Sequence, residues 1–125
     1  LKKNSISLIR LITPTTNESR LKLILNNASG FLYYVTITGI TGQHSANLKE
    51  LEKSIKSIKI HSNLPVMAGF GIKDANDVKE ICSIADGAVV GSSIVNIIEK
   101  NLNDKDKMLK SIDVFTKNLK LGTKI

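Results

Sequence analysis

Glycine-rich loops without charged side chains are the part of this chain most able to do chemistry. Three of them, "TGITG", "GFGI" and "GSS", each follow an apolar, strand-like run. Glycine lets the backbone approach a ligand closely and turn its N–H groups toward an anion. The third loop opens a short apolar helix, "SSIVNIIEK", whose N-terminus adds free N–H groups and a positive dipole end. Because the loops contain no lysine or arginine, backbone amides would have to hold a phosphate there.

Four residues are the candidate phosphate contacts. Gly91 and Ser92 stand at the entrance of the short helix, with the Ser92 hydroxyl as a further donor, and Gly42 and Gly71 would supply opposing backbone donors. Taken alone, any one of these loops is more simply explained as a tight turn. In (βα)8 barrels, however, loops after the last strands and a short extra helix often form a phosphate site, so three converging loops favour phosphate binding.

The other chemistry-bearing side chains stand alone. Cys82 lies on the apolar side of an expected helix, where a small core residue is the simpler interpretation; one cysteine fits a reducing compartment and excludes an internal disulfide. His44 is expected on a solvated loop and His61 at a helix end. Ser92 and Ser93 lack the context of a catalytic triad, and no cluster has metal-ligand spacing.

Strand-like and helix-like segments alternate along the chain. Strands are expected at 7–14, 31–36, 64–70 and 86–91. Helices are expected at 18–30 with Gly30 as the stop, around Leu48–Ile58, after an Asp74 cap, at 92–100, and around Met108, Ile112, Phe115 and Leu119. Four strands, each followed by a helix, predict a parallel α/β sheet with right-handed crossovers.

Such a sheet is either an open doubly wound sheet or an arc of a TIM (βα)8 barrel. A full barrel needs about 250 residues, whereas this chain has 125 and four units. The chain does not begin with Met, and "LKKNS" reads as the last turn of a helix. We therefore expect residues 1–125 to be one domain, a half-barrel fragment of four βα units plus a short phosphate-site helix.

The composition argues against nucleic acid and membrane as partners. The net charge is +7, but the lysines are interleaved with acids and apolar residues, as on solvated helix faces, and the chain has no Trp for stacking on bases. No apolar run has the length of a membrane span.

The segments "LITPTTNESRL", "ASGFLYYVTITGITG", "LPVMAGFGI" and "ADGAVVGSSIV" occur in this order along nearly the whole chain. Together they resemble the tryptophan synthase alpha subunit, with "YYVTITGITG" the most distinctive. The resemblance is to the C-terminal half of that barrel, from the end of its fourth helix onward.

This resemblance implies a cytoplasmic lyase of tryptophan biosynthesis that cleaves indole-3-glycerol phosphate to indole and glyceraldehyde 3-phosphate. It also implies a beta subunit as partner, which carries pyridoxal phosphate, and no cofactor on this chain. Carried over by position, the phosphate ligands are Gly42, Gly71, Gly91 and Ser92. Thr41 and Gly42 would lie on the mobile loop that closes the site, and Tyr33 and Phe70 would lie near the substrate.

The acid and base of this reaction are not expected in the chain. Protonating the indole ring and removing a hydroxyl proton suit two carboxyl groups with separated pKa values. None of the eleven acidic residues is expected at the C-terminal end of a strand: most fall in helices, Asp104 among them, Asp74 is a cap, and Asp86 begins the fourth strand. The resemblance places the catalytic glutamate and aspartate in the missing first half.

We therefore expect the fragment alone to be inactive and, with open sheet edges, to be dimeric or prone to aggregation. Two alternatives stay open: a non-catalytic phosphate-binding half-barrel that pairs with itself or with another half, and another phosphate-binding TIM-barrel enzyme, such as an isomerase of histidine or tryptophan synthesis.

Overall fold

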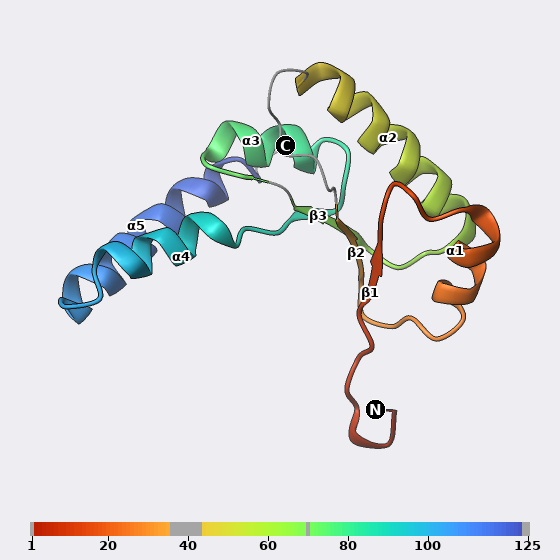
Figure 1. The fold of residues 1–125 in the computed structure, drawn as a ribbon, viewed down its shortest axis with the longest axis horizontal. Helices are drawn as coiled ribbons and strands as arrows, with labels where there is room; N and C mark the ends of the chain where they lie inside the picture. The colour runs from red at the N-terminus through yellow and green to blue at the C-terminus, as the bar shows by residue number, and fades with distance from the viewer. Residues whose placement is uncertain (1, 36–43, 70, 124–125) are drawn as a thin grey trace.

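The structure is a computed structural model that describes residues 2–35, 44–69 and 71–123. A short 3-10 helix η1 (Lys2–Asn4) precedes four strands and five helices (Figure 1). The elements follow in the order β1 (Arg10–Ile12), α1 (Glu18–Leu25), β2 (Leu32–Val35), α2 (His44–His61), β3 (Val66–Gly69), α3 (Ala75–Cys82), β4 (Gly87–Ala88), α4 (Ser92–Lys100) and α5 (Lys105–Leu121).

The four strands form one parallel sheet in chain order, β1-β2-β3-β4. One register line crosses the whole sheet, running through Leu11, Tyr33, Met67 and Gly87. The predicted succession of parallel βα units is thereby confirmed. Because parallel strands all end at the same edge, the described loops after β3 and β4 leave the sheet together.

The helices cover one face of the sheet. Alternate strand residues on that face are at most 2% exposed: Ile12, Leu32, Tyr34, Val66 and Ala68. They share one core with residues of α2 and α3, namely Leu51, Ile55, Ile58, Val78 and Ile81. On the other face Leu11 is 58% exposed, and Tyr33 and Met67 are half-buried. A sheet covered on one face only is what an arc cut from a barrel presents.

Side-chain caps determine where three of the helices begin. Asn17 accepts from the Arg20 N–H and starts α1, and Asp74 accepts from two N–H groups at the start of α3, as predicted. Asp104 was expected inside a helix, but it lies just before α5 and caps it by accepting from the Lys107 N–H. The short Asp side chain bonds the free first-turn amide better from the cap position than from within the helix.

The predicted stop of α1 at Gly30 is wrong. The helix ends at Leu25, and Gly30, with φ +81°, lies in the turn into β2. The segment between them is drawn to the residues before β1, because the Leu8 N–H donates to Ser29 Oγ and the Ser29 N–H donates to the Leu8 carbonyl. These bonds between distant segments end the helix before the glycine is reached.

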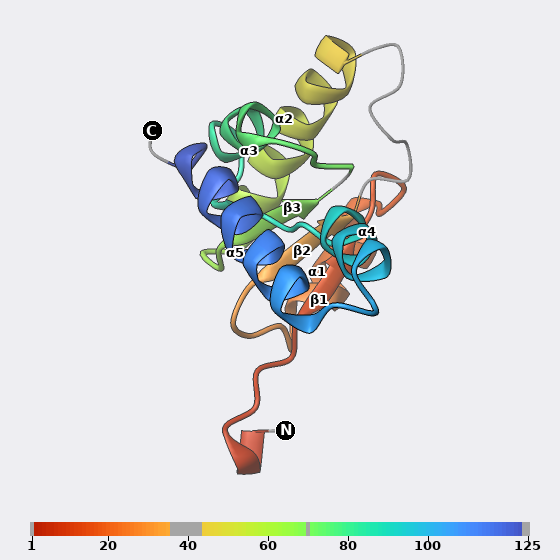
Figure 2. The same cartoon turned by 90° about the vertical axis from the view of Figure 1, so that its left-hand side faces the viewer.

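Helices α4 and α5 form a pair that extends beyond the β4 side of the sheet (Figures 1 and 2). The C-terminal part of α5 packs next to α3, with Leu119 buried, whereas α4 has no buried residue. Within the described residues, no helix has the length and apolar character needed to cross a bilayer.

Candidate phosphate-binding site

Two of the predicted glycine loops lie side by side at the C-terminal edge of the sheet. The Val89 N–H donates to the Ala68 carbonyl at 2.8 Å, which joins the end of β4 to the end of β3. Further along the same two loops, Ser93 Oγ donates to the Ile72 carbonyl at 2.6 Å. These bonds bring Gly71 and the Gly91–Ser92 start of α4 into one place.

The glycines at this edge differ in their surroundings. A Cβ added at Gly69 would lie 2.7 Å from the Val89 carbonyl oxygen, so packing alone explains that glycine. A Cβ added at Gly71 or Gly91 would meet no atom within 4 Å. Gly71 also has φ +53°, a backbone conformation that favours glycine. Open space beside Gly71 and Gly91 leaves room for a ligand close to the backbone.

The backbone donors near this space are free. Among the described residues, the N–H groups of Gly71, Ser92 and Ser93 have no acceptor. Helix α4 starts at Gly91 without a side-chain cap, in contrast to α1, α3 and α5. The Ser92 hydroxyl, which is exposed, also has no partner in the described part of the chain. An uncapped helix start with free amides and a free hydroxyl suits an anion.

Tyr33 lies beside this edge on the face of the sheet that the helices leave uncovered. A Cβ added at Gly69 would lie 3.1 Å from Tyr33 Oη, so the phenol of β2 reaches across to the end of β3. Three other predicted site residues, Thr41, Gly42 and Phe70, lie outside the described residues, and their roles stay predictions. His44 was expected on a loop but is the first residue of α2, because that helix begins earlier than the apolar spacing indicated.

All eleven acidic residues fall within the described part of the chain, and none lies at the C-terminal end of a strand. Asp74 and Asp104 are helix caps, and Asp86 precedes β4. The others lie in helices: Glu18, Glu50, Glu52, Asp77, Glu80, Glu99, Asp106 and Asp113. The described residues also contain no group of three His, Cys, Asp or Glu side chains placed to hold a metal ion.

Asp86 has a structural role at the opposite end of the sheet from the glycine loops. Its carboxylate accepts from Lys59 Nζ and from the Val66 N–H, both at 2.8 Å. Burial opposes ionisation of this carboxyl, but the hydrogen bonds from Lys59 and Val66, together with the charge of Lys59, outweigh it and lower the pKa. Asp86 therefore joins the C-terminal end of α2 to the starts of β3 and β4.

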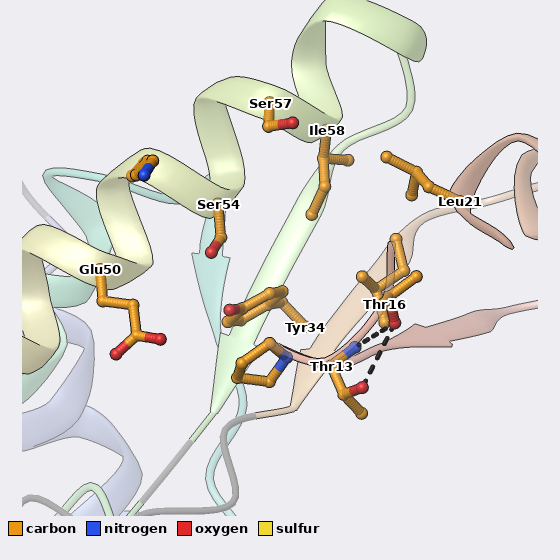
Figure 3. Close-up of a pocket in the computed structure, with 11 residues that line it drawn as sticks. Thr13, Thr16, Leu21, Tyr34, Glu50, Ser54, Ser57 and Ile58 are labelled. Atoms are coloured by element: carbon orange, nitrogen blue, oxygen red, sulfur yellow. Dashed lines mark hydrogen bonds between the residues drawn. The ribbon is translucent and has the colours of Figure 1, made fainter. Parts of the chain in front are cut away.

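A cavity of about 310 Å³ lies on the helix-covered side of β1 and β2 (Figure 3). Its polar lining includes Thr13, Thr16, Glu50, Ser54 and Ser57. Figure 3 shows that the Tyr34 hydroxyl points toward α2, and this oxygen is buried without a hydrogen-bond partner in the described part of the chain. The cavity is separate from the Gly71–Ser92 edge, because Tyr34 and Tyr33 point to opposite faces of β2.

Cys82 and His61 have structural surroundings. Burial raises the pKa of the Cys82 thiol, which disfavours the reactive thiolate, and the residue packs against the core as predicted. His61 ends α2, with Nε2 3.9 Å from a Glu18 carboxylate oxygen.

Comparison with known proteins determines the family. The family profile described as tryptophan synthase alpha chain matches residues 1–124. The chain belongs to the tryptophan synthase alpha chain family. The predicted family resemblance is confirmed, and the match does not favour the alternative of an isomerase of histidine or tryptophan synthesis.

Individual tryptophan synthase alpha chains agree with this assignment. The chain is 42% identical over 121 residues to that of Petrotoga mobilis and 48% identical over 107 residues to that of Methanocaldococcus jannaschii. These matches cover 97% and 86% of this chain but 47% and 38% of the two relatives. The chain thus spans about half the length of the relatives or less.

A solved structure shows the same relation. The alpha subunit of tryptophan synthase from Campylobacter jejuni is 36% identical and superposes with a TM-score of 0.77, covering 91% of this chain and 45% of that one. The predicted arc of a (βα)8 barrel is confirmed by this agreement. The coverage is consistent with a C-terminal fragment of an alpha chain.

Ser93 is the residue at this edge whose role the sequence did not reveal. Two adjacent serines in "GSS" are equivalent as letters, and no spacing rule says which hydroxyl faces the neighbouring loop. The structure separates them, since Ser93 bonds the Ile72 carbonyl and Ser92 does not.

Proposed function

We propose that this chain is the phosphate-binding part of a tryptophan synthase alpha subunit that acts in the cytoplasm. The full-length protein would cleave indole-3-glycerol phosphate to indole and glyceraldehyde 3-phosphate, a carbon–carbon lyase reaction. Membership of the tryptophan synthase alpha chain family supports the reaction class. The observation that carries the chain's own role is the set of free N–H groups on Gly71, Ser92 and Ser93 beside open space.

In this proposal the phosphate is held by neutral donors. Gly71 offers a backbone amide from the β3–α3 loop, while Gly91 and Ser92 bring in the start of α4 and one hydroxyl. The positive end of the α4 dipole favours a dianion there by a contribution of about 0.3–1 kcal/mol at an exposed site. Gly42, on the loop after β2, would complete the ring of donors. Thr41 would lie beside it on the closing loop.

The substrate body would lie on the face of the sheet that carries Tyr33. Its phenol crosses from β2 to Gly69, next to the loop that bears Gly71. Phe70 would add an apolar wall to the same pocket. These groups orient a ligand already anchored by its phosphate, which is the contribution that binding residues make to a reaction elsewhere on the molecule.

The acid and the base would come from the other half of the barrel. None of the chain's eleven carboxyl groups lies at the C-terminal end of a strand, and those of Asp74 and Asp77, at the start of α3, are engaged by backbone N–H groups. A beta subunit would be the partner of the complete alpha subunit, and pyridoxal phosphate would be bound by that partner.

Complementation with the missing half tests this function. The 125-residue chain is incubated with indole-3-glycerol phosphate alone and together with the N-terminal half of a related alpha chain, and indole release is measured. We expect no turnover by the chain alone and turnover by the mixture. Indole release by the isolated chain would show that our assignment of the acid and base to the other half is wrong.

A non-catalytic phosphate-binding half-barrel is the second candidate, and the distribution of the acidic residues favours it equally. The two candidates differ in what precedes Leu1 in the gene. Four further strand–helix units with carboxylates at strand ends would support the enzyme, whereas an in-frame start codon just before Leu1 would support a stand-alone module.

A further inference from the structure

The start of α4 carries two neighbouring serines in different situations. Ser92 is exposed, and its hydroxyl has no partner among the described residues. Ser93 is half-buried and donates its hydroxyl to the Ile72 carbonyl at 2.6 Å. Ser93 Oγ is thus engaged by the protein, whereas Ser92 Oγ is available to a ligand.

Helix α4 is weakly anchored without this bond. None of its residues is buried, and Val95 is 59% exposed. Its start has no side-chain cap, and its packing is mainly against α5. Within the described residues, the Ser93–Ile72 bond is the only hydrogen bond that joins a residue of α4 to another element or to the β3–α3 loop.

The other end of the bond is firmly held. Ile72 is 2% exposed and belongs to the core that also contains Val78 and Ile81. Gly71 directly precedes Ile72 and is the second residue after the end of β3. Because Ile72 is fixed in the core, the bond from Ser93 to its carbonyl fixes the position of the first turn of α4 relative to the β3–α3 loop.

We propose that Ser93 is a positioning residue of the phosphate site. Its hydroxyl holds the start of α4 against the β3–α3 loop, so that the N–H groups of Gly71, Ser92 and Ser93 can donate to the same phosphate. Ser93 Oγ itself does not contact the ligand. The inference rests on the proposed function, since it assumes that a phosphate is bound at this edge.

Titration of the ¹⁵N-labelled 125-residue chain with glycerol 3-phosphate tests the role. The variants are Ser93→Ala, Ser93→Thr and, as the matched neighbour, Ser92→Ala. Loss of one hydrogen bond predicts that Ser93→Ala weakens binding about 3- to 10-fold. The thermal unfolding midpoint should change little, because α4 contributes no buried residue to the core. Ser93→Thr keeps the hydroxyl and should bind within about twofold of the unsubstituted chain.

The amide signals distinguish positioning from ligation. In Ser92→Ala, which loses a ligand hydroxyl but keeps the bond to Ile72, the Gly71 and Ser92 amides should still shift together on titration. In Ser93→Ala the chemical-shift change of the Gly71 amide should fall relative to that of the Ser92 amide. The reason is that the β3–α3 loop and the start of α4 are no longer held together.

Each other outcome has a definite meaning. Three results would overturn the positioning role while leaving the phosphate site intact. They are an unchanged affinity in Ser93→Ala, an equally weakened affinity in Ser93→Thr, and a weakening that is fully explained by a smaller folded fraction of the variant. If the unsubstituted chain produces no shift at Gly71 and Ser92, the phosphate site itself is wrong, and the positioning role falls with it.

Discussion

Gly69, Gly71 and Gly91 lie near the candidate phosphate site, yet a side chain would meet different conditions at each. At Gly69 a methyl group would press on the Val89 carbonyl in a buried place. At Gly71 the space is open but φ is +53°. At Gly91 the space is open and φ is −120°, so the backbone itself does not require glycine. The three positions therefore separate packing, backbone strain and ligand access.

Alanine at each of these positions should give a graded result. Gly69→Ala should lower the free energy of unfolding by about 1–3 kcal/mol through overpacking, and Gly71→Ala by about 1 kcal/mol through the left-handed backbone. Gly91→Ala should leave stability unchanged but weaken glycerol 3-phosphate binding, because its methyl occupies the ligand's space. Urea unfolding and ligand titration measure the two effects. A Gly91→Ala chain as unstable as Gly69→Ala would contradict the assignment.

The Tyr34 hydroxyl gives a second prediction at this scale. The side chain is 1% exposed, burial raises the pKa of its phenol by more than the neighbouring Ser54 hydroxyl lowers it, and the geometry gives Oη no hydrogen bond in the described part of the chain. Removing an unsatisfied buried polar group at constant shape is nearly neutral or stabilising. Tyr34→Phe should therefore change the free energy of unfolding by less than about 0.5 kcal/mol, or raise it. Ser57→Ala, at an exposed serine on the same helix, is the control, and a loss above about 1 kcal/mol in Tyr34→Phe would reveal a bond between this hydroxyl and Ser54.

At the scale of the elements, the C-terminal end of α2 and the starts of β3 and β4 meet at Asp86. Hydrogen bonds from Lys59 and Val66, with the charge of Lys59, outweigh burial and hold the pKa of this carboxyl below its usual value of 3.8. A group whose pKa is lower in the folded than in the unfolded chain stabilises the fold above its unfolded pKa. That stability is lost as pH falls through the folded pKa, because the unfolded chain then binds more protons.

Acid should accordingly weaken this junction. We expect the free energy of unfolding to fall between pH 5 and pH 3 by more in the unsubstituted chain than in Asp86→Asn, as measured by urea unfolding at each pH. Glu52→Gln is the matched control: the hydrogen bond and charge of Lys56 lower the pKa of Glu52, but that pair lies on the exposed surface and should contribute little. Equal pH dependence in the Asp86→Asn and unsubstituted chains would remove the role given to Asp86.

At the scale of the whole molecule, much apolar surface is left uncovered. On the α4–α5 pair, Val95 is 59%, Leu102 70% and Leu109 53% exposed. Strands β1 and β4 have no described neighbour on their outer edges. Unpaired edges and apolar patches of this kind promote association. Since the relatives are about twice as long, the same surfaces are where the rest of a barrel would pack.

The isolated chain should therefore self-associate in spite of its net charge of +7. Light scattering after size-exclusion chromatography should give a mass above 13.6 kDa. The double variant Val95→Lys and Leu109→Lys should shift the chain toward the monomer and weaken its complex with the N-terminal half. Leu23→Lys, at a residue that is 75% exposed on α1 at the far side of the sheet (Figure 1), should affect the complex less. A monomeric, cooperatively unfolding chain would contradict the half-barrel.

The order and type of the elements could be predicted from the sequence because they depend on local patterns. Apolar runs, helical spacing and the Asp74 cap each involve residues close together in the chain, and the structure has the predicted elements at these places. The parallel sheet followed from the alternation of strands and helices, because the connections leave few topologies. The candidate site was predicted at the level of loops, by the glycines in "GFGI" and "GSS".

Tertiary structure alone decided the matters that depend on contacts between distant segments. The bonds between Ser29 and Leu8 end α1 at Leu25. The register of the sheet places Tyr33 and Tyr34 on opposite faces. The approach of two loops lets Ser93, and not Ser92, bond the Ile72 carbonyl. Local propensity is nearly the same for either tyrosine or either serine. Only the register of the sheet and the approach of two loops, set by burial across the whole core, distinguish them.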